Sequence, residues 1–215
     1  MDSLLTVLEN LLPTSETPAA TLPWIVGLPL LGALINAIFS KNASRATISA
    51  VAISSVAMAF LGALYAFVRL VMQEHGAGGE GGVAGFSYDA YEWFSISISG
   101  GDSGTYHIPV RVRFVMDHLS GIMTVMVTGI ASLIHVYSSA YMGEDPGYRR
   151  FMVYLNLFTA SMLILVLSSN IPLMFVGWEG VGLCSYLLIG FWWENPAYAA
   201  AGRKAVVVNR IGDFG

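Results

Sequence analysis

The residues of this chain best suited to chemistry are ionisable side chains inside long apolar stretches. Glu179 is the clearest, because apolar residues flank it on both sides in the run IPLMFVGWEGVGLCSYLLIGFWW over 171–193. Burial raises the pKa of a carboxyl group and a neighbouring cation lowers it, so such a group can be tuned to bind and release protons near neutral pH. We therefore expect Glu179 to transfer protons. The alternative is a structural ion pair that holds helices together.

A second set of charges lies in the stretch that begins near Ala197. With a helical rise of about 1.5 Å per residue, Arg210 and Asp213 fall about 20 and 24 Å from the inner end of their span, and Glu179 about 21 Å. Arg210 and Asp213 are three residues apart and can pair on one helix face. Breaking this pair would change the electric field at Glu179, whereas a static buried pair would not. Lys204 lies closer to the inner end of the span, about 10 Å from it. It is either a functional charge or a lysine that snorkels to the membrane surface.

His135 is the ionisable residue of the apolar stretch 119–141, about 9 Å from its inner end and so near the level of Lys204. An intramembrane histidine can shuttle protons, but a hydrogen-bonded core histidine fits the pattern equally well. Two further residues favour structural roles. Asp117 is placed to cap the helix that follows it, and Cys184 is a single thiol in an apolar run.

The composition indicates that a lipid bilayer surrounds these residues. Hydrophobic side chains make up 55% of the 215 residues and charged ones only 11%, against about 25% charged in an ordinary soluble domain. The mean hydropathy is +0.66. A net charge of −4 argues against nucleic acid as a partner. The single cysteine excludes a disulfide framework or a multi-cysteine metal centre, and we expect no metal or cofactor on this chain.

Six apolar stretches are long enough for membrane-spanning helices, which need about 17–25 residues. They cover about 22–39, 48–71, 119–141, 151–167, 171–193 and the residues from 197 onward. The expected fold class is an all-α membrane protein, a polytopic bundle of transmembrane helices. The last stretch is still apolar at Gly215, so we expect the chain to be cut within the sixth helix and to be the N-terminal part of a longer protein.

The connections between these stretches predict the orientation and the domain organisation. Basic residues at 41, 45, 149, 150, 203 and 204 mark the cytoplasmic side, which leaves the N-terminus outside. We divide the chain into an amphipathic N-terminus (1–21), two helices (22–72), an outer loop (73–113) and a helical core (114–215). In the outer loop, a glycine-rich tether over 75–82 precedes a β-hairpin predicted from the alternating runs 91–99 and 105–114.

Four stretches resemble the antiporter-like subunits of respiratory complex I, the NADH:quinone oxidoreductase. They are VGWEGVGLCSYLLIGFWW (176–193), FVMDHLSGIMTVMVTGIASLIHVYSSAYM (114–142), RRFMVYLNLFTASMLILVLSSN (149–170) and GRKAVVVNRIGDFG (202–215). The resemblance is to the family of the largest such subunit. It is strong over about 110–215 and weaker before that. Mrp-type cation/proton antiporters share this family.

The resemblance implies a fold of two inverted five-helix repeats with broken helices, of which this chain holds the first part. Glu179 matches the family glutamate of the fifth helix, which pairs with a lysine on the seventh. Arg210 and Asp213 match the arginine and aspartate of the sixth helix that are implicated in coupling, and Lys204 matches a basic residue earlier in that helix. The chain ends before the seventh helix, so we expect a truncated chain, a split gene product or a fragment.

The function implied by this resemblance is that of a proton-translocating membrane-arm subunit of NADH:quinone oxidoreductase. The chain would be a translocase subunit without a redox centre of its own, while NADH, FMN, iron–sulfur clusters and quinone would bind to partner subunits. Its partners would be the lipid bilayer and other membrane-arm subunits. Its location would be the bacterial inner membrane, with the mitochondrial inner membrane less favoured. Alternatives are a subunit of an Mrp-type sodium/proton antiporter and a purely structural membrane subunit.

Overall fold

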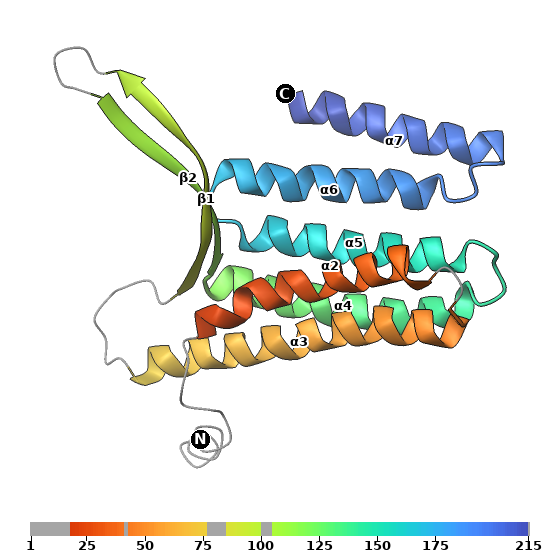
Figure 1. Cartoon of the computed structure of the whole chain (residues 1–215), viewed down its shortest axis with the longest axis horizontal. Helices are drawn as coiled ribbons and strands as arrows, with labels where there is room; N and C mark the ends of the chain where they lie inside the picture. Colours follow the sequence, from red (N-terminus) through yellow and green to blue (C-terminus); the bar gives the residue numbers. More distant parts are fainter. Residues whose placement is uncertain (1–17, 41–42, 77–84, 100–104, 215) are drawn as a thin grey trace.

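The computed structural model describes residues 18–40, 43–76, 85–99 and 105–214. These residues form a short 3-10 helix η1 (Pro18–Thr21), helices α2 (Leu22–Ile38), α3 (Arg45–Gly76), α4 (His118–Tyr141), α5 (Tyr148–Leu167), α6 (Ile171–Ile189) and α7 (Pro196–Phe214), and strands β1 (Phe86–Ser99) and β2 (Thr105–Met116). Successive helices run in alternating directions side by side, and the hairpin rises from one end of the bundle (Figure 1). Most of the predicted amphipathic N-terminus lies outside the described residues.

Within the described residues, five helical segments are long and apolar enough to cross a membrane, namely Pro18–Ile38, Arg45–Gln73, His118–Tyr141, Tyr148–Leu167 and Ile171–Ile189. The predicted class of a polytopic helical membrane protein is therefore confirmed. The sixth predicted span forms a helix, α7, but it is not among these five. Four charged side chains over 19 residues make α7 much less apolar than the other helices. It nevertheless lies alongside α6 as the next member of the bundle (Figure 1).

Helix α6 is shorter than the apolar run that predicts it. It ends at Ile189, and Gly190 is its C-cap. The expected end at Trp193 is therefore wrong, because the last aromatic residues belong to a turn. The indole of Trp192 donates a hydrogen bond to the Asp145 carboxylate at 2.9 Å, and the Arg150 guanidinium donates to the Phe191 carbonyl at 3.2 Å. These contacts tie the end of α6 to the start of α5.

The distribution of polar residues on α4 is the reverse of that in a soluble protein. Its buried residues are all glycine or polar: Gly121, Thr124, Thr128, His135 and Ser138. Apolar side chains of the same helix point outward, and Leu119 and Leu133 are about 70% exposed. Hydrocarbon is as apolar as leucine, so membrane helices pack through small and hydrogen-bonding residues. The burial pattern therefore supports the membrane assignment independently of helix length.

Small side chains also bring α3 close to its neighbours. Residues at a three- or four-residue spacing along one face are fully buried, and most are alanine: Ala52, Val56, Ala59, Ala63 and Ala66. Helical neighbours three and four positions apart lie on one face. This face is nearly flat because most of its side chains are single methyl groups. It packs against α2 and α4.

The predicted β-hairpin is present and is longer than the sequence pattern indicates. The strands pair antiparallel from Phe86 with Met116 to Ser99 with Thr105. Arg113 holds the pKa of the Asp89 carboxyl below its ordinary value, chiefly through a side-chain hydrogen bond. At the hairpin base, the Asn170 side chain donates to the Arg111 carbonyl at 2.7 Å, and Asn170 also caps α6. The glycine-rich tether falls mainly in residues 77–84, outside the described part of the chain.

The N-terminal end of α4 is fixed by a reciprocal capping arrangement. The Asp117 carboxylate accepts a hydrogen bond from the backbone N–H of Ser120 at 2.7 Å, and the Ser120 hydroxyl accepts one from the backbone N–H of Asp117 at 2.8 Å. This contact confirms the predicted cap. The backbone hydrogen bond from Ser120 is the main reason why the pKa of Asp117 is lowered.

Candidate functional site

Helix α6 presents Glu179 on the side away from α5. The helix begins with the Asn170 cap and Pro172 in its first turn, and Glu179 lies in its third turn. A Cβ atom at Gly177 would lie 2.5 Å from the backbone nitrogen of Leu165, so this glycine allows the backbones of α5 and α6 to meet. A step of two residues along a helix turns the side-chain direction by about 200° about the helix axis. The side chain of Glu179 is therefore turned toward α7.

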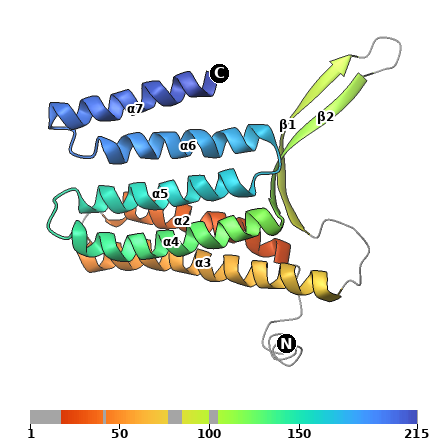
Figure 2. The same ribbon diagram turned by 180° about the vertical axis from the view of Figure 1, so that it is seen from behind.

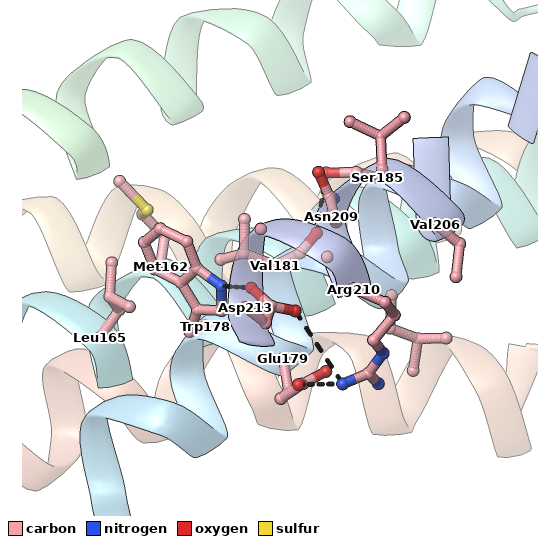
Figure 3. A pocket seen from close by; sticks show the side chains of 14 residues that line it. Met162, Leu165, Trp178, Glu179, Val181, Ser185, Val206, Asn209, Arg210 and Asp213 are labelled. Carbon is pink, nitrogen blue, oxygen red and sulfur yellow. Dashed lines mark hydrogen bonds and ion pairs between the residues drawn. The ribbon is translucent and has the colours of Figure 1, made fainter. Parts of the chain in front are cut away.

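Three charged side chains from α6 and α7 meet at this place (Figure 3). The guanidinium of Arg210 forms an ion pair with the carboxylate of Glu179, and the same nitrogen lies 4.0 Å from the Asp213 Oδ2 atom. The Trp178 indole N–H donates to the other Asp213 oxygen at 2.6 Å. One cation is thus shared between two carboxylates. The Asp213 carboxylate also accepts a hydrogen bond from a neutral group, the Trp178 indole.

The ion pair lines a pocket of about 480 Å³ between α5, α6 and α7. Most of the other lining side chains are apolar, such as Met162 and Val206, while Asn209 adds an amide. The side chain of Glu179 is 23% exposed and that of Asp213 is 14% exposed. A carboxylate in such a setting is sensitive to the position of its counter-ion, because few other groups can compensate its charge. The structure thus places Glu179 where its electrostatic surroundings depend chiefly on Arg210.

The structure brings three of the five predicted site residues together. Glu179, Arg210 and Asp213 share one layer, as the depth estimate predicts. The expected pair of Arg210 with Asp213 is present only at 4.0 Å, and the closer partner of Arg210 is Glu179 on the adjacent helix. Lys204 is exposed and does not line the pocket. The roles of all these residues stay predictions.

The fifth predicted residue, His135, lies at a separate place among α3, α4 and α5. It is 1% exposed. Its Nδ1 atom lies 2.7 Å from the Ala131 carbonyl oxygen, and its Nε2 atom lies 2.6 Å from the Asn156 side-chain oxygen. The Asn156 amide nitrogen in turn donates to the Ser55 hydroxyl at 3.0 Å. Met162 of α5 lines both the pocket at Glu179 and a groove beside His135.

Some residues of these two sites were missed by sequence reasoning. Trp178 could have been found as the aromatic neighbour of Glu179, and Asn156 as an amide inside an apolar stretch. Ser55 carries no such signal, because serine is common on the packed faces of membrane helices. Among the described residues, no group of three or more His, Cys, Asp or Glu side chains could hold a metal ion.

Two family models match separate parts of the chain. The model described as "NADH-Ubiquinone oxidoreductase (complex I), chain 5 N-terminus" matches residues 103–152. The model described as "NADH:quinone oxidoreductase/Mrp antiporter, TM" matches residues 168–215. The second match covers Glu179, Arg210 and Asp213. The first covers the hairpin strand β2, His135 and the start of α5.

Similar proteins share these descriptions. NADH-quinone oxidoreductase subunit L of Mycobacterium tuberculosis (strain ATCC 25618 / H37Rv) is 58% identical over 100 residues, covering 46% of this chain and 16% of that protein. Subunit L of Escherichia coli (strain K12) is 43% identical over 187 residues, covering 86% of this chain and 28% of that protein. NAD(P)H-quinone oxidoreductase chain 5 of Synechocystis sp. (strain ATCC 27184 / PCC 6803 / Kazusa) is 40% identical over 196 residues, covering 90% of this chain and 27% of that protein.

The fold is also similar to a solved structure. A chain in the "Structure of Mrp complex from Dietzia sp. DQ12-45-1b" superposes with a TM-score of 0.61 and 25% sequence identity, over 89% of this chain and 18% of that chain. The chain thus spans between 16% and 28% of the length of these curated relatives.

Proposed function

Because this chain belongs to the family of subunit L or chain 5 of NADH-quinone oxidoreductase, we propose that it forms part of a proton-translocating membrane subunit. Glu179 is the group that binds and releases the proton. The observation that carries the proposal is the sharing of the Arg210 guanidinium between the Glu179 and Asp213 carboxylates in one pocket. A single cation between two anions can alternate between them, which a simple ion pair cannot do.

The proton step follows from the position of this cation. With Arg210 against Glu179, the carboxylate keeps its charge. When Arg210 shifts to Asp213, the Glu179 carboxylate loses its counter-ion in a largely apolar pocket and binds a proton. The return of Arg210 expels that proton. Trp178 keeps Asp213 in place through its indole N–H, so the second position for Arg210 stays available.

The energy for moving Arg210 comes from outside this chain. We propose that NADH, FMN, iron–sulfur clusters and quinone are bound by partner subunits, and that other membrane-arm subunits pack against this chain. Lys204 and His135 are further candidates for carrying protons or coupling charge. The membrane is the bacterial inner membrane, with the N-terminus outside and the basic connections on the cytoplasmic side.

A second candidate function is that of a subunit of an Mrp-type sodium/proton antiporter. Two findings support it: the description of the family model over residues 168–215 and the likeness to a chain of the Mrp complex. An antiporter would exchange protons for sodium in membrane vesicles without NADH. A complex I subunit would translocate protons only while NADH is oxidised. Proton uptake by vesicles with either sodium or NADH therefore separates the two functions.

The direct test of the proposal replaces Glu179 by glutamine in the full-length protein in its native membrane. We expect the proton transfer that Glu179 carries to slow by on the order of 10²–10⁴, so proton translocation per NADH oxidised should fall. NADH oxidation with an artificial acceptor should be unchanged. Glu194→Gln is the matched control, because Glu194 is exposed in the turn before α7. Unchanged coupling in Glu179→Gln would contradict the proposal.

A further inference from the structure

A hydrogen-bonded chain crosses three helices at His135, apart from the pocket of Glu179. It runs from the His135 imidazole on α4 through the Asn156 side chain on α5 to the Ser55 hydroxyl on α3. The exposed fractions of these residues are 1%, 0% and 9%. The Ser55 hydroxyl donates onward to the Ala52 carbonyl at 2.9 Å. Each member therefore depends on the next for its hydrogen bonds, because none can reach water.

The partners of the imidazole determine its protonation. The Ala131 carbonyl can only accept a hydrogen bond, and it lies 2.7 Å from Nδ1. The Asn156 oxygen also only accepts, and it lies 2.6 Å from Nε2. A neutral imidazole has one N–H and one bare lone pair. With the Asn156 amide in this orientation both nitrogens face acceptors, which fits the doubly protonated imidazolium, whereas the turned amide fits a neutral ring.

In the neutral form of His135, the hydrogen bonds that join His135, Asn156 and Ser55 must run in the opposite direction. If Nδ1–H continues to donate to the Ala131 carbonyl, Nε2 needs a donor, and the Asn156 amide supplies one by turning half a revolution. Its oxygen then faces Ser55, whose hydroxyl must leave the Ala52 carbonyl and donate to Asn156. The two amide orientations have nearly the same shape. Proton loss at His135 would thus reverse the two hydrogen bonds on either side of the Asn156 amide and break the one from Ser55 to the Ala52 carbonyl.

Close packing of α2 brings Asn156 and Ser55 together. Gly32 of α2 lies against the contact between Asn156 and Ser55, and a Cβ atom at this glycine would collide with the Asn156 amide nitrogen and the Ser55 hydroxyl oxygen. The absence of a side chain at position 32 is therefore what lets the two polar groups meet. Four helices, α2 to α5, converge on this point.

We infer that Asn156, supported by Ser55, is a positioning residue that couples proton binding at His135 to a reversal of this buried hydrogen-bond chain. The inference deepens the proposed function. It rests on that proposal only in taking protons to be what the subunit transports. Among the described side chains, no charged group forms a hydrogen bond or ion pair with the imidazole. The described charged residues on the elements packed against α4 include Arg45 and Arg69 of α3, Arg149 and Arg150 in the first turn of α5, and Arg111 and Arg113 of β2.

The test follows the protonation of His135 directly. The full-length protein is labelled with ¹⁵N-histidine in lipid bilayers, and the His135 signals are identified by their loss in His135→Gln. Nitrogen chemical shifts measured against pH then give the titration midpoint of this residue. Asn156→Asp supplies an acceptor with a negative charge and should raise the midpoint by about one pH unit or more. Asn156→Leu removes the acceptor and should lower it by about the same amount.

Matched controls separate this coupling from a general packing effect. Asn36 is also fully buried, but its partners are the Ile48 carbonyl and the Ser40 hydroxyl. Asn36→Leu should therefore leave the His135 midpoint unchanged, and Asn36→Asp should raise it by less than Asn156→Asp does. If Asn156→Leu does not accumulate, Asn156→Ala replaces it with the same expected direction. Midpoints that do not differ between the two Asn156 variants, or that shift equally in the Asn36 variants, would overturn the inference.

This titration is independent of proton translocation. Loss of coupling in Glu179→Gln without any effect of Asn156 on the His135 midpoint would reject the inference and leave the proposed function intact. Opposite midpoint shifts in the Asn156 variants, with coupling retained in Glu179→Gln, would support the inference and reject Glu179 as the proton carrier. The two ideas therefore fail separately.

Discussion

At the scale of single residues, the arrangement around Arg210 is set by which groups satisfy each carboxylate. Asp213 receives a hydrogen bond from the Trp178 indole, which carries no charge and does not titrate. Glu179 receives no such neutral donor among the described residues and depends on Arg210. Our proposal assigns the proton to Glu179 rather than to Asp213 because, among the described residues, Glu179 has no hydrogen-bonding partner other than the cation.

Asp117 offers a residue-scale prediction on stability and pH. Its folded pKa lies below the ordinary value of 3.8 because of the Ser120 N–H, so its stabilisation is full at neutral pH and is lost as pH falls below that value. We expect Asp117→Ala to cost about 1 kcal/mol at pH 7 and much less at pH 3. Asp117→Asn, which keeps a capping oxygen, should show little pH dependence. Thermal unfolding of the purified protein in detergent measures both. An equal cost at the two pH values would contradict this explanation.

The sequence predicts single residues well where one side chain contrasts with its surroundings. Glu179 is such a case, because it interrupts an apolar run. The partners of a residue are harder to predict, since they depend on how each helix is rotated about its axis. Arg210 could pair with Asp213 by spacing alone, and only the packing of α7 against α6 turns it toward Glu179. The Asn156–Ser55 contact depends on the same kind of information.

At the scale of elements, the approach of α6 to α5 decides where Glu179 lies. A Cβ atom at Gly177 would meet backbone atoms of Leu165 and Ser161 at 2.5–2.9 Å. Backbone cannot move aside as a flexible side chain can, so any larger residue must push the two helices apart. Gly177 therefore fixes the position of the Glu179 carboxylate relative to α7.

This geometry gives a prediction at the scale of elements. Gly177→Ala should destabilise the protein by about 1–3 kcal/mol and should lower proton translocation by displacing Glu179. Gly182→Ala in the same helix is the control, because the nearest atom to a Cβ there is the Asn209 amide nitrogen at 3.8 Å. Thermal unfolding and proton translocation per NADH oxidised are the two measurements. If the two alanine variants behave alike, close packing at Gly177 is not what positions Glu179.

Element boundaries were predictable where composition changes sharply. The starts of α2, α4 and α6 follow from the onset of apolar residues and from capping residues such as Asp117 and Asn170. The end of α6 was not predictable from hydropathy, because Trp192 and Trp193 extend the apolar run into a turn. The hairpin begins at Phe86 rather than at residue 91, since pairing with β2 continues beyond the clearly alternating residues.

At the scale of the whole molecule, the alternating helices separate two ends of the bundle. The α4–α5 and α6–α7 connections lie at one end, together with the end of α2 and the start of α3, and the hairpin strands and the α5–α6 turn lie at the other (Figure 2). Arg45, Arg149 and Arg150 lie at the first end, whereas Arg69, Arg111 and Arg113 lie toward the other. The predicted orientation therefore rests on the short connections between helices, whose basic residues the positive-inside rule counts.

The orientation is testable by cysteine labelling in the full-length protein after native cysteines, including the buried Cys184, have been replaced. We expect Ser95→Cys, on the exposed part of β1, to react with a membrane-impermeant maleimide in intact spheroplasts. Glu144→Cys, in the α4–α5 connection, should react only in inverted vesicles. The reverse labelling pattern would show that the predicted orientation is wrong.

The central claim is that Glu179 and Arg210 act as one proton-binding unit, and a double-mutant cycle tests it most directly. Proton translocation per NADH oxidised is compared among the full-length protein, Glu179→Gln, Arg210→Gln and the double variant. Residues that act as a unit have strongly non-additive effects, so we predict that the double variant loses no more coupling than the worse single variant. Losses that multiply in the double variant would contradict the claim, because they would show two independent roles.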